Sequence, residues 1–120
     1  MASLDMFGPY SFDKETIDAT LDDESIGNYA LGHKNDDGVF VVNYVGRATD
    51  QPLKDRIKQH LGEKPSKYKL FKYSYADTAK NAYLKECKNY HDFGEKDLLE
   101  NDYHPAKLPD DETKCPICGE

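Results

Sequence analysis

The sequence predicts an α/β (α+β) domain in which helices flank a three-stranded antiparallel sheet, because a strand hairpin precedes a helix, a third strand and a longer helix. Segments 26–32 and 39–47 are rich in Ile, Val, Tyr, Phe and Leu, as strands are. They flank a turn at 35–38, in which Asp37-Gly38 favours the positive φ angles of a tight hairpin. The two segments are therefore expected to pair as antiparallel strands.

Apolar spacing predicts the elements that follow the hairpin. A four-residue repeat of Leu53, Ile57 and Leu61 indicates an amphipathic helix over residues 52–61. Residues 67–75 alternate enough to form the third strand, and a longer helix is expected over residues 79–92.

The chain divides into three parts. Residues 1–25 form an acidic N-terminal extension with a short helix that ends at Leu21. Residues 26–104 form the domain, and residues 105–120 form a polar tail that closes on a Cys-x-x-Cys pair.

The faces of the hairpin follow from strand alternation, because alternate residues of a strand share a face. Tyr29 is expected on the face of Leu31, and Tyr44 on the face of Val42 and Phe40. Both tyrosines reach one face of the sheet if the register of the hairpin allows it.

Composition limits the class of protein. A chain of 120 residues, 38% of them hydrophobic and with a mean hydropathy of -0.87, is expected to form one domain with a modest core. Its start lacks the basic and apolar regions of a signal peptide, and no stretch approaches the roughly 18 apolar residues of a membrane span. We expect a soluble cytoplasmic protein that does not bind membranes. In the reducing cytoplasm, its three cysteines favour a metal site over disulfides.

Two short blocks, Gly27-x-Tyr29 and Tyr44-x-Gly46, lie one hairpin apart and are followed by Arg56, Glu86 and Asn101. This ordered set resembles the GIY-YIG nuclease superfamily over residues 26–101, about two thirds of the chain. Two residues depart from the family pattern: Val45 is a mild change, and Asn28 places a polar group where the family has an aliphatic one.

The resemblance implies hydrolysis of a phosphodiester bond by residues of these blocks. By it, Tyr29 is the general base, Tyr44 orients water or phosphate, Arg56 neutralises charge in the transition state, and Glu86 holds a single Mg²⁺ or Mn²⁺. His60, one helical turn after Arg56, is expected to contact phosphate or to relay a proton.

A tyrosine is a poor base at neutral pH unless a nearby cation lowers its pKa. Arg47 or the metal ion is expected to supply that cation.

Charge is distributed unevenly along the chain. Its net charge is -7, yet residues 47–72 hold eight Lys and Arg against three acids, a local charge of +5. A basic segment interleaved with aromatic residues suits contact with DNA. The candidates for that contact are Arg47, Lys54, Lys58, Lys67, Lys69 and Asn101. The alternative for these lysines is a solvated helix face and an edge strand protected by charge.

A second metal site is predicted from the cysteines. Cys87 and His91 share one helix face, and Cys115 and Cys118 form half of a zinc knuckle, so the four side chains make a candidate tetrahedral zinc site. His104 competes with His91 as the fourth ligand. The alternative is a loose tail with a buried Cys87.

The sequence therefore predicts a metal-dependent endonuclease acting on DNA, with branched or otherwise structured DNA among the candidate substrates. The alternative is a zinc-stapled DNA-binding or protein-interaction module on the same fold, in which catalysis is weak or lost. Recognition of particular DNA would come from the acidic N-terminal segment, a homodimer or a separate specificity partner.

Purified protein is expected to contain about one zinc ion per chain, because the short tail needs an anchor on the last helix. Elemental analysis measures the metal directly. A zinc-free chain that is fully folded would contradict this site.

Overall fold

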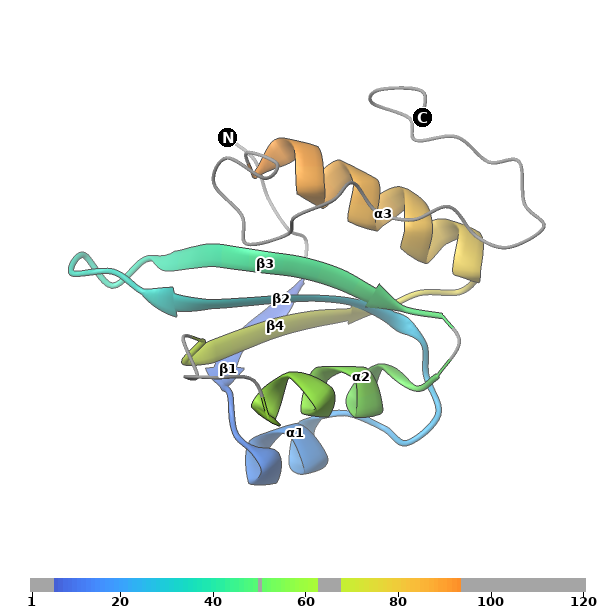
Figure 1. Ribbon diagram of the computed structural model, residues 1–120, viewed down its shortest axis with the longest axis horizontal. Coiled ribbons are helices and arrows are strands. Elements are labelled where there is room, and N and C mark those ends of the chain that lie inside the picture. Colours follow the sequence, from blue (N-terminus) through green and yellow to red (C-terminus); the bar gives the residue numbers. More distant parts are fainter. Residues whose placement is uncertain (1–5, 50, 63–67, 94–120) are drawn as a thin grey trace.

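A four-stranded antiparallel sheet with the strand order β1-β4-β2-β3 organises the chain (Figure 1). The computed structural model describes residues 6–49, 51–62 and 68–93. The strands are β1 (Phe7–Ser11), β2 (Gly27–Lys34), β3 (Phe40–Ala48) and β4 (Leu70–Tyr75). The helices are α1 (Lys14–Thr20), α2 (Leu53–Gln59), a 3-10 turn η1 (His60–Gly62) and α3 (Ala79–Asp92).

The helices cover both faces of the sheet. Helices α1 and α2 lie on one face and α3 lies on the other (Figure 1). The larger apolar core lies under α1 and α2, where Ile17, Leu53 and Ile57 are fully buried against the sheet. A smaller core under α3 contains Ala30 and Val45. The domain thus has three layers, which give the sheet two separate interfaces with helices.

The helices agree well with the predicted ones. Helix α3 has the predicted bounds, and Thr78 caps it by accepting a hydrogen bond from the Asn81 backbone N–H at 3.1 Å. The predicted helix over 52–61 is α2 followed by η1. Helix α1 ends one residue before Leu21, and Asp13 caps it through the Thr16 N–H at 2.8 Å.

The predicted three-stranded sheet is wrong by one strand. Segment 7–11, assigned to the acidic extension, forms β1 and pairs antiparallel with β4 at the edge of the sheet. Its sequence, Phe-Gly-Pro-Tyr-Ser, carries a proline and a glycine that usually argue against a strand, although an edge strand tolerates them. The strand is also only five residues long, so alternation gives little signal.

The prediction that Tyr44 shares a face with Val42 and Phe40 is also wrong, because β3 contains a bulge. Leu31 pairs with Tyr44 whereas Gly32 pairs with Val42, so Asn43 is the extra residue. Tyr44 packs with the core under α2, while Val42 packs with the core under α3. Tyr44 lies two residues from Gly46, the partner of Tyr29, so regular alternation puts the two tyrosines on one face, as the prediction allowed, and the bulge turns Val42 and Phe40 to the other face.

The C-terminal tail over residues 105–120 lies outside the described residues. Among the residues that are described, none of the helices combines the length and the apolar character needed to cross a bilayer.

Phe12→Ala is expected to destabilise the fold by about 3 kcal/mol, because Phe12 is buried against Phe71 and Tyr68. Phe7→Ala, a matched change 61% exposed on β1, is expected to cost less than about 1 kcal/mol. Urea denaturation measures both free energies of unfolding. Equal small costs would show that the N-terminal segment is not part of the folded core.

Candidate active site

Tyr29 is the centre of a buried cluster between β2 and the end of α2. Its side chain is fully buried, and its hydroxyl lies 2.7 Å from His60 Nε2, in a hydrogen bond whose direction depends on the histidine tautomer. His60 ends α2 and begins η1, so the helix end directs its ring toward the strand. The predicted tyrosine and histidine are therefore brought together from positions 31 residues apart.

The glycine of the second block has a steric role. Gly46 pairs directly with Tyr29 across the hairpin. A Cβ on Gly46 would lie 2.5 Å from the Tyr29 hydroxyl oxygen, and closer still to the ring carbon that carries it. The tyrosine ring thus crosses the backbone of β3 at a point that only glycine leaves open.

Tyr44 joins the cluster because it lies two residues from Gly46, on the same face of β3. Its ring stacks on Tyr29 with centroids 6.2 Å apart, and lies 5.1 Å from the ring of His60. The bulged Asn43 is held by a 2.7 Å hydrogen bond between its side-chain oxygen and His33 Nδ1. The bulge was not predicted, since nothing in the local sequence distinguishes it from regular alternation.

Electrostatics around the Tyr29 hydroxyl are dominated by burial. Burial raises the pKa of Tyr29 above its ordinary value, and the nearby Tyr44 raises it further. Arg56 lowers this pKa through its charge and a hydrogen bond to the hydroxyl, whereas the charge of Glu86 raises it. Among the described side chains, the cation that acts on the tyrosine is therefore Arg56, where Arg47 was a candidate.

Arg47 instead forms an ion pair with Glu86 through Nη1 and Oε1. The two side chains are only 13% and 11% exposed, and the Arg47 guanidinium lies over the ring of Tyr83 at 5.1 Å. Tyr83 was not predicted as a site residue, although its position three residues before Glu86 puts it on the same side of α3. Arg47, predicted to contact DNA, therefore holds the carboxylate predicted to bind metal.

Glu86 is compatible with a Mg²⁺ or Mn²⁺ ion. Among residues 6–49, 51–62 and 68–93, no group of three or more His, Cys, Asp or Glu side chains is placed to hold a metal. Mg²⁺ does not need such a group, because it is often bound by one or two carboxylates, waters and substrate phosphate oxygens. Arg47 would then share the Glu86 carboxylate with the ion.

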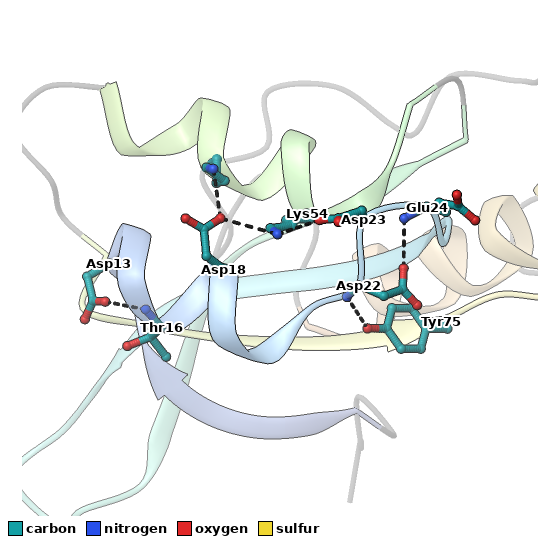
Figure 2. A network of polar contacts seen from close by, with 9 residues as sticks. Asp13, Thr16, Asp18, Asp22, Asp23, Glu24, Lys54 and Tyr75 are labelled. Carbon is teal, nitrogen blue, oxygen red and sulfur yellow. Dashed lines mark hydrogen bonds and ion pairs between the residues drawn. The ribbon is translucent and has the colours of Figure 1, made fainter.

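The predicted DNA-binding lysines of α2 face a different neighbour. Lys58 Nζ lies 2.9 Å from Asp18, and Lys54 Nζ lies 2.7 Å from Asp23 and 3.6 Å from Asp18. Figure 2 shows Asp18 of α1 pointing at the lysines of α2, with Asp23 on the far side of Lys54. The hydrogen bond from Lys58 lowers the pKa of Asp18, so these charges are held as ion pairs between the two helices.

The other predicted DNA contacts are less well defined. Lys69 is exposed just before β4. Lys67 and Asn101 lie outside the described residues. Contact of Lys67, Lys69 or Asn101 with DNA stays a prediction.

The predicted zinc site is only half within the described residues. Cys87 is fully buried beside Tyr83, and His91 is half-buried one helical turn later. Cys115, Cys118 and the competing His104 lie outside the described part of the chain, so the site stays a prediction.

Comparisons with known proteins add no family to this geometry. No protein-family model, no curated protein and no solved structure matches the chain. The function is therefore inferred from the geometry of the site itself.

Gly46→Ala is expected to cost about 1–3 kcal/mol of stability, because the added methyl group forces the Tyr29 ring away from His60. Denaturant unfolding measures the cost, and the NMR signals of the His60 ring report the displacement.

Gly38→Ala is the control. It adds the same methyl group in the hairpin turn, where nothing lies within 4 Å and only the positive φ angle of 78° is strained. The His60 signals should stay in place in that variant. Unmoved His60 signals in Gly46→Ala would contradict the steric role of the glycine.

Proposed function

We propose that this protein is a metal-dependent endonuclease that hydrolyses DNA phosphodiester bonds. The observation that carries the proposal is the environment of the Tyr29 hydroxyl, which is hydrogen-bonded to His60 and lies within electrostatic reach of Arg56 and Glu86. These four residues come from β2, α2, its C-terminal turn and α3. A proton acceptor beside the hydroxyl, with a cation and a carboxylate within electrostatic reach, suits phosphoryl transfer to water.

The raised pKa of Tyr29 determines how it would act. Ionisation of the Tyr29 hydroxyl is unfavourable in this buried position, so Tyr29 would not act as a preformed tyrosinate base. A neutral His60 would instead accept the hydroxyl proton at Nε2 while the Tyr29 oxygen takes a proton from the attacking water. The water oxygen then bonds to phosphorus, the P–O bond to the leaving alkoxide breaks, and the alkoxide is protonated by solvent.

Two further side chains would support this step. Arg56 would neutralise the charge that builds up on the phosphoryl oxygens, and it already acts on the hydroxyl through its own charge. Glu86, held by Arg47, would bind Mg²⁺ or Mn²⁺, which when bound supplies further stabilisation of that charge. Recognition of particular DNA, by a homodimer or a separate partner, is part of the proposal as well.

A second candidate function is a DNA-binding or protein-interaction module with weak or absent catalysis. Two observations favour it: burial opposes ionisation of Tyr29, and Arg47 already pairs with the Glu86 carboxylate. The two functions differ in their effect on supercoiled, branched and flapped DNA incubated with Mg²⁺ or Mn²⁺.

Wild-type protein is expected to cleave at least one of these DNA substrates. Tyr29→Phe and Glu86→Gln are each expected to lower the cleavage rate by about 100-fold or more, because each removes a group that acts on the reacting atoms. Single-turnover cleavage on gels measures the rates.

Tyr10→Phe and Glu15→Gln are matched controls, since both residues lie outside the site, at β1 and in the first turn of α1. They should retain the wild-type rate. Absence of cleavage by the wild type would favour the binding module, and undiminished cleavage by both site variants would contradict the roles proposed for Tyr29 and Glu86.

A further inference from the structure

One row across the sheet meets α3 entirely through polar side chains. Asn28 on β2 pairs in register with Arg47 on β3 and with Ser74 on β4. Residues paired in this way lie side by side on neighbouring strands and face the same way. The row therefore presents an amide, a guanidinium and a hydroxyl to the helix above it.

Each member of the row contacts the same part of α3. Arg47 pairs with Glu86, the Asn28 Nδ2 donates to the Ala82 carbonyl at 2.9 Å, and Lys85 Nζ donates to Ser74 Oγ at 2.8 Å. The three contacts fall within residues 82–86 of the helix, which is little more than one turn.

Beside the row, Ala30, Val45 and Tyr90 form an apolar part of the α3 interface. Apolar contact is not directional, so it brings a helix to a sheet without fixing its rotation. Hydrogen bonds and ion pairs have preferred angles and do fix it. The polar row is therefore the part of the interface that determines which way the side chains of this turn point.

Asn28 is an energetically unfavourable residue for its buried position. The residue is fully buried, and its Oδ1 accepts no hydrogen bond from the described residues. A buried amide with an unmet acceptor is less favourable than an apolar side chain of the same shape. Stability alone therefore does not explain an asparagine here.

We propose that Arg47, Asn28 and Ser74 form a positioning row, which fixes the rotation of α3 and thereby the direction of the Glu86 carboxylate. Asn28 is the central positioning residue, because it alone joins the row to the helix backbone through the Ala82 carbonyl among these three contacts. The effect on catalysis rests on the proposed nuclease function, whereas the orientation of Glu86 is testable without it.

The direct test is the NMR spectrum of the Arg47 guanidinium in wild type and in Asn28→Leu. Paired with Glu86, the Arg47 side-chain N–H protons should exchange slowly with solvent in the wild type. In Asn28→Leu they should exchange at least about tenfold faster, while the Tm changes by no more than about 4 °C.

Asn89→Leu is the matched control, since Asn89 is a buried asparagine of α3 that lies outside the row. Its Arg47 signals should remain as in the wild type. Ser74→Ala is the second variant, which removes the Lys85 contact with little change of shape. Unchanged Arg47 exchange in both Asn28→Leu and Ser74→Ala would overturn the positioning row.

Catalysis gives a second readout. Asn28→Leu should lower the maximal cleavage rate by about 10- to 100-fold with the Kd for DNA within about twofold, because a displaced carboxylate affects the reaction more than binding. If the wild type does not cleave DNA, but its Arg47 protons are protected and Asn28→Leu exposes them, the nuclease is rejected and the positioning row is retained. If Asn28→Leu cleaves at the wild-type rate and its Arg47 protons exchange as in the wild type, the positioning row is rejected and the nuclease is retained.

Discussion

The antiparallel pairing of β2 with β3 is the constraint on which both faces of the candidate site depend. Its register puts Gly46 opposite Tyr29, which lets the tyrosine ring cross β3 toward His60. The next pair along the strands is Asn28 with Arg47, and their side chains turn to the opposite face and meet α3. Because side chains alternate along a strand, a slip of one residue would separate both sets at once.

Burial of Tyr29 gives the site its order and limits its chemistry. A fully buried hydroxyl needs a hydrogen-bond partner, and His60 satisfies it. The same burial raises the pKa of the tyrosine, and the Arg56 cation only partly offsets that rise. A hydroxyl in this position is suited to passing a proton on to a histidine and poorly suited to holding a negative charge.

The sequence predicted local elements better than it predicted their combination. The hairpin, α2 and α3 follow from turn residues and apolar spacing, which are properties of neighbouring residues. Strand β1 and the bulge at Asn43 depend on pairing with distant segments, so the fourth strand and the face of Val42 and Phe40 were not predictable from alternation. At the site, Tyr29 and His60 were predicted and do meet, whereas the pairing of Arg47 with Glu86 required the positions of β3 and α3.

Helix α2 shows why a local excess of basic residues is a weak guide to a binding surface. Residues two positions apart lie about 200° apart around a helix, so Lys54 and Arg56 point in nearly opposite directions. Lys54 and Lys58 face Asp18 of α1, and Lys54 also pairs with Asp23 after that helix (Figure 2). Arg56 lies beside the Tyr29 hydroxyl. Exposed ion pairs of this kind add little stability, but they neutralise the lysines before any phosphate reaches them. A nucleic acid that engages this domain would therefore approach from the side of Arg56, where the charge of α2 faces the candidate site.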